Sequence, residues 1–296
     1  MTFKSRKYFF SFISSIYKLC KKDPLISAVI LILAASAYTY EVKVARPDFA
    51  YKGLPQTQNW QQPFHWFRTL RNDAFMLGYS DLRGNPLWVS YKINSVNPKA
   101  KRLSRPQRFS KDWRTVNPVN HQDYLHSGYD RGHMAPNYAI SRLYGKQAQL
   151  DTFLMSNISP QKPKLNQKLW QRLERVEINY FTQLGKDLWV YTGPIFDSKI
   201  QRLKNAWNVE IPDAFYKIYA LPATTGKPKL LAFLIPQQVK GNEPLTRFLT
   251  TVDEIERLTG LDFFTDLPDK LENKLESKIN SAQWKLNKVA NLPSQY

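Results

Sequence analysis

The chain has 296 residues, of which 43% are hydrophobic and 23% are charged, a composition typical of a globular protein and not of a disordered one. Its net charge of +19 favours a nucleic-acid ligand, with a charge kept for solubility as the simpler alternative. The single cysteine, Cys20, excludes a disulfide, a cysteine-ligated zinc site and a thiol nucleophile in the main body.

The amino terminus combines a basic leader with an apolar segment. The first 24 residues hold six basic residues and one acidic residue, so the remaining 272 residues still carry +14. Residues 25–40 contain no charge and directly follow a basic and proline-containing stretch. They predict an N-terminal membrane anchor or signal helix within residues 1–40, with cleavage after Ala37 as the alternative. The positive-inside tendency then predicts export of everything after residue 40, and a mitochondrial address is the competing interpretation.

The next elements in the chain are a linker and a pair of strands. Residues 41–62 are interrupted by prolines and predict an extended linker. Apolar residues alternate over residues 75–79, and residues 87–93 form a second β-like run after an Arg-Gly-Asn-Pro turn. Residues 95–129 are polar and rich in proline, which predicts mostly loop.

The most informative motif follows that loop. Residues 129–136 read YDRGHMAP, so that Asp130, Arg131 and His133 surround Gly132. An imidazole can take a proton from water near neutral pH, and a guanidinium can hold a phosphate through two parallel hydrogen bonds. Glycine permits a tight turn or a close approach of the backbone to a ligand. This set of residues suits hydrolysis of a phosphodiester.

A helix is predicted over residues 162–184, where apolar side chains recur every three or four residues. Asn166, Trp170 and Glu174 each follow one residue after this apolar stripe. On an α-helix, Asn166 and Glu174 lie about 80° apart around the axis and can border one site. Their oxygen atoms are suitable ligands for a hard cation. The apolar stripe consists of Leu165, Leu169, Leu173, Val176 and Tyr180.

The rest of the chain predicts more strands and two further helices. Residues 188–193 are typical of a buried strand, and residues 214–221 and 230–235 predict a strand pair around a Gly-Lys-Pro turn. Residues 252–258 predict a short helix that ends near Gly260. Residues 269–296 alternate lysine with glutamate and predict an exposed helical tail. Residues 63–268 therefore form one α+β domain with a mixed, largely antiparallel sheet core.

Several blocks of the chain resemble the sugar-nonspecific DNA/RNA endonuclease family, which includes endonuclease G and secreted bacterial nucleases. The blocks occur in order between Asp73 and Leu267 and include the motif at residues 129–136. The other blocks are SNISPQ at 156–161, LNQ at 165–167 with Trp170 and Glu174, YTGP at 191–194, FYK at 215–217 with Pro212, and VDEIERLTGLDFF at 252–264. The resemblance implies that residues 63–268 are a non-specific endonuclease domain with a ββα-metal finger.

The resemblance also implies roles for individual residues. His133 is the general base that activates the attacking water, and Arg131 contacts the phosphate or orients the site. Asn166 is the direct protein ligand of Mg²⁺, with Mn²⁺ as a substitute, and Glu174 holds the metal through water. An upstream arginine stabilises the transition state, and Arg108 is its best positional match. Arg102, Arg105 and Arg114 are the other candidates for that upstream arginine.

Other polar residues are assigned structural roles. We expect Asp130 to fix the turn of the motif and Asn157 to hold the scaffold through hydrogen bonds. His65 lies among aromatic residues and is expected to be packed, whereas His121 and His126 are expected to be exposed to solvent.

The predicted function is a metal-dependent endonuclease that cleaves DNA and RNA with little sequence preference, because phosphate contacts carry no sequence information. The alternative is a non-catalytic module at the cell envelope that binds nucleic acid, for example during DNA uptake. The partners expected are DNA, RNA and a membrane, and a homodimer is compatible with the sequence.

Overall fold

The computed structural model describes residues 23–40, 44, 46–97, 99–100, 102–197, 199–223 and 227–294. The chain divides into two compact units, Met1–Asp48 and Phe49–Tyr296. In the first unit, helix α2 spans Pro24–Tyr40 and buries none of its residues. Within the described residues, no helix has both the length and the apolar character needed to cross a membrane. The basic leader up to residue 22, with Cys20, lies outside the described residues.

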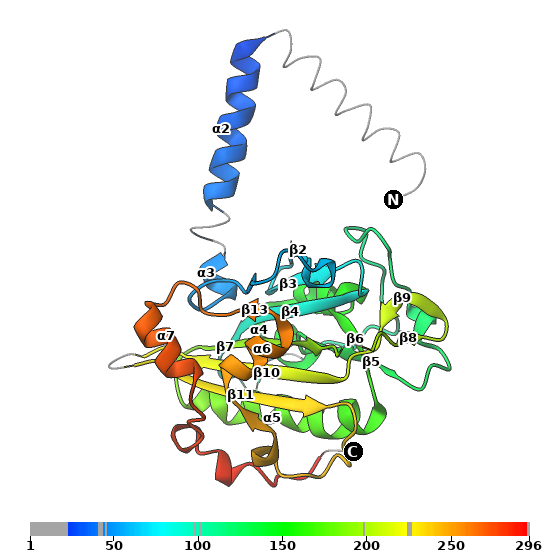
Figure 1. Ribbon diagram of the computed structural model, residues 1–296, viewed down its shortest axis with the longest axis vertical. Coiled ribbons are helices and arrows are strands. Elements are labelled where there is room, and N and C mark those ends of the chain that lie inside the picture. The colour runs from blue at the N-terminus through cyan, green and yellow to red at the C-terminus, as the bar shows by residue number, and fades with distance from the viewer. Residues whose placement is uncertain are drawn as a thin grey trace. The chain divides into compact units, whose positions relative to one another are not determined.

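The second unit is built around a seven-stranded sheet in the order β12-β11-β10-β7-β4-β3-β2 (Figure 1). Every pair of neighbouring strands in it is antiparallel. This confirms the predicted sheet class and the predicted pairing of residues 214–221 with residues 230–235. The strands are β2 (Arg68–Arg71), β3 (Phe75–Ser80), β4 (Asn85–Ile93), β7 (Leu188–Ile195), β10 (Ala214–Leu221), β11 (Lys229–Pro236) and β12 (Leu249–Thr250).

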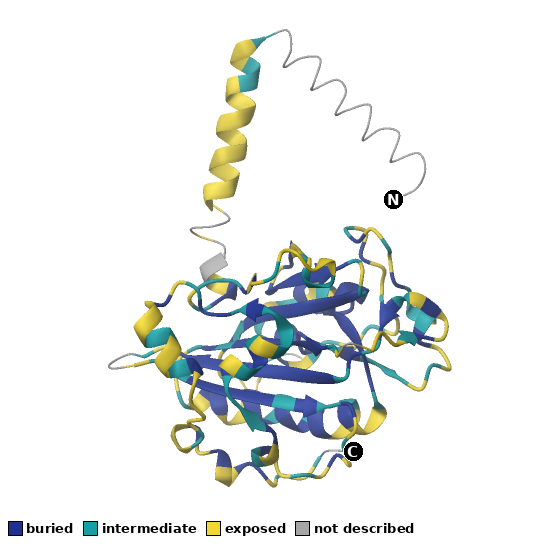
Figure 2. Cartoon of the chain, viewed as in Figure 1, coloured by how far each residue is buried: buried dark blue, intermediate teal, exposed yellow. Residues whose placement is uncertain are grey.

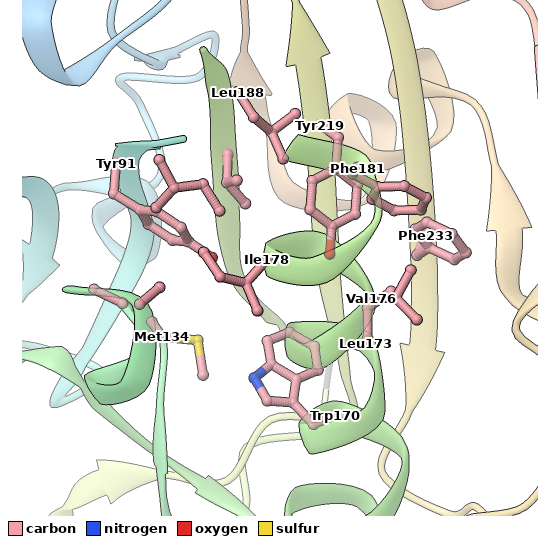
Figure 3. Close-up of a cluster of buried hydrophobic side chains, with 14 of the residues drawn as sticks. Tyr91, Met134, Trp170, Leu173, Val176, Ile178, Phe181, Leu188, Tyr219 and Phe233 are labelled. Carbon is pink, nitrogen blue, oxygen red and sulfur yellow. The ribbon is translucent and has the colours of Figure 1, made fainter. Parts of the chain in front are cut away.

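Both faces of this sheet are covered, so its central strands are buried almost throughout (Figure 2). Alternate residues of a strand point to opposite faces. In β10, Phe215 and Tyr219 therefore join one hydrophobic core and Tyr216 joins the other. Helices α4 (Asn137–Thr152) and α5 (Gln171–Asn179) contribute to the first core. Figure 3 shows Leu173 and Val176 of α5, and Trp170 directly before this helix, in the same buried cluster as Tyr219 and Phe233 of the strands.

The second core lies under α6 (Val252–Thr259) and α7 (Asp269–Glu276). Helix α6 begins where the hydroxyl of Thr251 accepts a hydrogen bond from the backbone N–H of Glu254 at 3.1 Å. It ends at Gly260, which adopts the left-handed conformation with φ of 66°. The predicted short helix and its glycine stop are confirmed.

The helix predicted over residues 162–184 is present but not regular. Residues Leu165–Trp170 (η5) form a π-helix, which continues into α5 and then into the 3₁₀ turn η6 (Phe181–Gln183). A π-helix has wider turns than an α-helix, because its hydrogen bonds join residues five apart. The angle of 80° expected between Asn166 and Glu174 assumed α geometry throughout and does not apply.

A second, two-stranded sheet pairs β5 (Asp130–His133) with β6 (Ile158–Gln161) in antiparallel register. Together with the helical segment that follows β6, it gives a strand–strand–helix unit. A small hairpin of β8 (Arg202–Leu203) and β9 (Ala206–Glu210) lies beside a satellite core that includes Ile158. The region 95–129 is mostly irregular in its described residues, as predicted, apart from the turn η3 (His121–Tyr124).

The two ends of the second unit pack onto its body. Phe49 and Ala50 are buried, and β1 (Gln56–Thr57) pairs with β13 (Leu261–Asp262), so part of the segment assigned to a linker belongs to this unit. The expectation of an exposed tail is wrong for its second half, because apolar side chains there join the core beside α5. These residues are Trp284, Leu286, Val289 and Ala290. The remaining short helical elements are α3 (Arg46–Phe49), η2 (Pro63–His65), η4 (Met155–Asn157), η7 (Leu245–Phe248), η8 (Ala282–Trp284) and η9 (Leu286–Lys288).

Candidate active site

The strand pair β5–β6 carries the motif of residues 129–136. Gly132 lies opposite Ser159 and packs against the buried side chain of Gln161, so that a Cβ atom at residue 132 would overlap the Gln161 carboxamide. The glycine was expected at a tight turn or against a ligand. It instead lies within a strand, where a neighbouring side chain occupies the space that a Cβ atom would need.

The segment after His133 is held by Asn157. The buried Asn157 amide accepts a hydrogen bond from the N–H of Ala135 at 2.9 Å, and it donates to the carbonyls of Ala135 and Thr152 at 3.1 and 3.0 Å. The backbone carbonyl of Asn157 accepts a hydrogen bond from the N–H of Met134 at 3.0 Å. These bonds confirm the predicted scaffold role of Asn157 and fix the direction in which the chain leaves β5.

The His133 ring packs against two phenyl rings that also contact each other. Its centroid is 5.2 Å from that of Phe109 and 5.0 Å from that of Phe153, with the second pair in an edge-to-face arrangement. Its Nε2 atom is buried and has no hydrogen-bond partner. Burial, and then the positive charge of Arg105, lower the pKa of His133 to about 3. A pKa this low keeps the imidazole neutral at pH 7, so that one ring nitrogen is unprotonated.

Asp130 connects β5 to the π-helix. Its carboxylate accepts hydrogen bonds from the side-chain amides of Asn166 at 2.9 Å and Gln167 at 2.8 Å. Because the amide nitrogen of Asn166 is used in this bond, its Oδ1 atom is the one left available to a ligand. The expected structural role of Asp130 is present, but it is exerted on Asn166 rather than on a turn.

Glu174 is half-buried in α5, and burial raises its pKa to about 7, against the opposing effect of Lys217. One turn further along the helix, Glu177 is fully buried and accepts hydrogen bonds from Lys217 at 2.9 Å and from the hydroxyls of Tyr91 and Tyr219 at 3.0 and 2.9 Å. Lys217 is equally buried, so the two charges form an ion pair without solvent. This pair fixes α5, and thereby Glu174, on the sheet.

Arg131 is held by the segment before the motif. Its Nε and Nη2 atoms both donate to the carbonyl of His121, at 3.0 and 2.5 Å. His121 is half-buried, stacks on Phe109 and accepts a hydrogen bond from the Phe109 N–H at 3.3 Å. The expectation that His121 is exposed is therefore wrong.

One cavity of about 780 Å³ joins these side chains. His133, Arg131, Asn166 and Glu174 all line it, as expected from the sequence. Five arginines and two glutamates contribute to its wall, so its charge suits an anionic ligand. The charged residues of the lining are Arg102, Arg105, Arg131, Arg142, Arg175, Glu174 and Glu177.

Two of the upstream arginine candidates line this cavity, Arg105 and Arg102, whereas Arg108 is not part of the lining. The guanidinium of Arg105 lies 5.3 Å from the ring centroid of Phe153, the same ring that contacts His133. Arg114 is engaged elsewhere, by Asp112 and Asn72.

Glu177 and Lys217 were not singled out from the sequence. A signal was present for Lys217, because it interrupts an otherwise uncharged run of apolar and aromatic residues in a strand buried on both faces. A lysine in such a position requires a buried partner. Nothing in the sequence identifies that partner as Glu177.

Most of the chain matches a family of known proteins. A model of the family described as DNA/RNA non-specific endonuclease matches residues 66–270. A nuclease from Nostoc sp. is 31% identical over 221 residues, which cover 71% of this chain and 77% of that protein. Human mitochondrial endonuclease G is 30% identical over 211 residues, 66% of this chain and 69% of that protein.

Two further similarities agree with this result. A nuclease from Serratia marcescens is 30% identical over 203 residues, which cover 64% of this chain and 73% of that protein. The fold is similar to that of a chain in a crystal structure of the EndoG/EndoGI complex, with a TM-score of 0.62 and 23% identity. The alignment covers 75% of this chain and 90% of that chain.

Proposed function

Because the chain belongs to the DNA/RNA non-specific endonuclease family, we propose that it hydrolyses phosphodiester bonds of both DNA and RNA with little sequence preference. The observation that carries this proposal is the single cavity shared by His133, Asn166 and the arginines. A neutral imidazole, an amide oxygen and several guanidinium groups in one cavity are what attack of water on a phosphodiester requires.

His133 is the proposed general base. Its low pKa keeps the ring in the proton-accepting form, and the phenyl rings of Phe109 and Phe153 hold the ring in place. A phosphodiester in the cavity brings a negative charge beside the ring, which raises the pKa and makes the imidazole a stronger base. The water that loses its proton to His133 attacks phosphorus, the 3′ oxygen leaves, and the product carries a 5′ phosphate.

Asn166 and Glu174 are the proposed metal-binding residues, and their chemistry fits a hydrated divalent cation. Asn166 offers one neutral oxygen, directed by the bond from its amide to Asp130, and Glu174 offers a carboxylate within the same cavity. Magnesium keeps most of its water molecules and accepts few protein ligands, and manganese accepts the same oxygen donors. A bound Mg²⁺ or Mn²⁺ ion supplies stabilisation of negative charge at the phosphate and the leaving oxygen.

Arg105 and Arg131 are the proposed phosphate contacts. Both line the cavity, whereas Arg108, the first choice from the sequence, is exposed outside it. Arg131 retains N–H groups beyond the two that bind the His121 carbonyl. We therefore assign stabilisation of the transition state to Arg105 in place of Arg108.

Location and assembly are proposed on the sequence alone. The uncharged segment of residues 25–40 after a basic leader supports a signal that takes the body out of the cytoplasm, with mitochondria as the alternative. A homodimer stays a prediction.

Plasmid nicking by the full-length protein with MgCl₂ tests the proposed function. We expect His133→Ala to lower the cleavage rate by about 10²–10⁴-fold, the usual contribution of a general base, while DNA binding in a gel-shift assay persists. The matched control is His126→Ala, because His126 lies in an exposed loop and outside the cavity lining. If the wild-type protein binds DNA but does not cut it with magnesium, the non-catalytic binding module replaces this proposal.

A further inference from the structure

Three carboxylates converge on the side of the sheet opposite the cavity. Asp253 and Glu256 lie on α6, and Glu276 is the last residue of α7. One oxygen atom from each lies within 4.8 Å of the others. Because α6 and α7 pack on the second hydrophobic core whereas α4 and α5 pack on the first, this group is separated from His133 and Asn166 by the sheet (Figure 1).

In the described part of the chain, the most buried member of the group, Glu276, has one oxygen atom without a partner. Glu276 is only 4% exposed, and its Oε1 atom is buried without a hydrogen bond from any described residue. Glu256 accepts a single hydrogen bond, from the backbone N–H of Phe263 at 2.8 Å. Among the described residues, no lysine or arginine forms an ion pair with Asp253, Glu256 or Glu276. A buried carboxylate without a counter-charge is strongly unfavourable.

The surroundings add negative charge rather than compensate for it. Burial, and then the charges of Glu256, Glu272, Asp253 and Asp262, raise the pKa of Glu276 to about 9. The Oε1 atom of Glu272 is also buried without a partner. Five carboxylates are thus grouped in a chain whose net charge is +19. Such a group is stabilised either by a proton or by a cation.

We propose that Asp253, Glu256 and Glu276 form a second cation site, specific for calcium, that fastens α7 to α6. Calcium binds oxygen atoms at 2.3–2.6 Å, so ligands on opposite sides of the ion stand up to about 5 Å apart, whereas magnesium spans only about 4.2 Å. The three carboxylate oxygen atoms lie within 4.8 Å of one another, close enough for one calcium ion to contact all three. Water molecules complete the coordination of an ion that takes six to eight oxygen ligands.

The competing explanation is that Glu276 is simply a protonated, buried acid. The two explanations differ in the response to CaCl₂. To separate this site from the cavity, the test uses full-length protein carrying Asn166→Ala, which removes the proposed ligand of the other metal. Calorimetric titration with CaCl₂ and with MgCl₂ measures binding, and thermal unfolding with and without CaCl₂ measures its effect on stability.

We expect the Asn166→Ala protein to bind one calcium ion, more tightly than magnesium, and its Tm to rise by at least about 3 °C when calcium is in large excess over its Kd. Adding Glu276→Gln should abolish this rise and weaken calcium binding at least tenfold. Adding Glu254→Gln should leave both unchanged, because Glu254 is on the same helix but pairs with Arg257.

A parent protein that neither binds nor is stabilised by CaCl₂ would overturn the proposal in favour of the protonated acid. The proposal is equally overturned if the rise in Tm survives Glu276→Gln. If the Glu276→Gln protein does not fold, Asp253→Asn takes its place, since Asp253 is exposed. The same tenfold loss of calcium affinity is expected for it, and retention of full affinity contradicts the site.

Discussion

At the scale of single residues, the orientation of one amide decides which atom is available to the proposed metal ion. An asparagine side chain can present either its nitrogen or its oxygen, and only the oxygen can bind a cation. In this protein the carboxylate of Asp130 accepts from the nitrogen of Asn166. Asp130 is therefore a positioning residue that acts through Asn166.

Replacing Asp130 by alanine is expected to weaken metal binding without removing a ligand. Loss of the hydrogen bonds to Asn166 and Gln167 frees the amide to rotate, and outer partners of this kind typically contribute 10- to 100-fold to metal affinity or activity. The concentration of MgCl₂ that gives half-maximal cleavage should rise by that factor, and saturating MgCl₂ should restore most of the rate. Asp187→Asn, outside the cavity lining, should change neither value. A lowered rate that excess magnesium does not restore would argue against a positioning role.

The identity of the upstream arginine that enters the cavity could not be predicted from the sequence. His133, Asn166, Glu174 and Arg131 could all be named in advance, and they share one cavity. Arg105 and Arg108 lie three residues apart in an irregular segment without periodicity. Which of them enters the cavity depends on the packing of the Arg105 guanidinium on Phe153. That contact joins distant parts of the chain and leaves no local signal.

At the scale of elements, the strand pair β5–β6 depends on the lack of a side chain at Gly132. Gly132 leaves room for the Gln161 carboxamide, which is buried and has no hydrogen-bond partner at either amide atom. A methyl group at residue 132 would have to displace it.

Gly132→Ala is therefore expected to lower the free energy of unfolding by about 1–3 kcal/mol, the usual cost of overpacking a well-packed interior. Denaturation with urea measures the change. Adding Gln161→Ala should recover most of the loss, because the shortened side chain vacates the space. If the two losses in free energy of unfolding simply add in the double variant, residues 132 and 161 do not compete for the same space.

The helix after β6 shows a second limit of prediction. Apolar residues recur along it as on an α-helix, and this pattern correctly predicts a helix. The same pattern does not distinguish a π-helical turn over Leu165–Trp170 from an α-helical one, because both keep one face on the core. Helix α4 was not anticipated at all. It is interrupted by Gly145, which has a φ of 85°, and its sequence lacks a clear apolar stripe.

At the scale of the whole molecule, the buried carboxylate of Asp112 ties separate segments together. It accepts hydrogen bonds from the Ser156 hydroxyl at 2.6 Å, just before β6, and from the Arg114 guanidinium at 2.6 Å. Arg114 in turn donates to the carbonyl of Arg71 and the side chain of Asn72, at the end of β2. The irregular segment 95–129 is thereby anchored to both sheets.

Because this anchor relies on an ionised carboxylate, the stability of the protein should fall at acidic pH. Burial opposes ionisation of Asp112, but the hydrogen bonds from Arg114 and Ser156 outweigh it, and its pKa lies below the ordinary 3.8. The stabilisation is therefore fully present above pH 3.8 and is lost as the pH falls through the lower pKa of the folded state. At pH 7, Asp112→Asn should destabilise the protein by about 2 kcal/mol.

Urea denaturation across pH 3–7 measures the difference in free energy of unfolding between Asp112→Asn and the wild-type protein. This difference should become smaller below pH 4. Asp187→Asn serves as the control and should track the wild-type protein at every pH. A gap between Asp112→Asn and wild type that is constant with pH would contradict the ionic origin of the stabilisation.

The inner strands of the seven-stranded sheet were predictable from the local sequence, whereas its edge strands β2 and β12 were not. The runs over residues 75–79, 87–93, 188–193 and 214–221 consist of apolar and aromatic residues bounded by turns. The burial of Trp284 and Leu286 was not predictable, since lysines surround them in sequence and only tertiary contacts bring them into the core.

The ring of Phe153 affects the relative positions of two residues of the candidate site. It contacts the imidazole of His133 and the guanidinium of Arg105, so the proposed general base and the proposed phosphate-binding group pack against the same ring. We therefore expect a movement of the Phe153 ring to displace both groups together, so that their separation varies less than it would on independent loops.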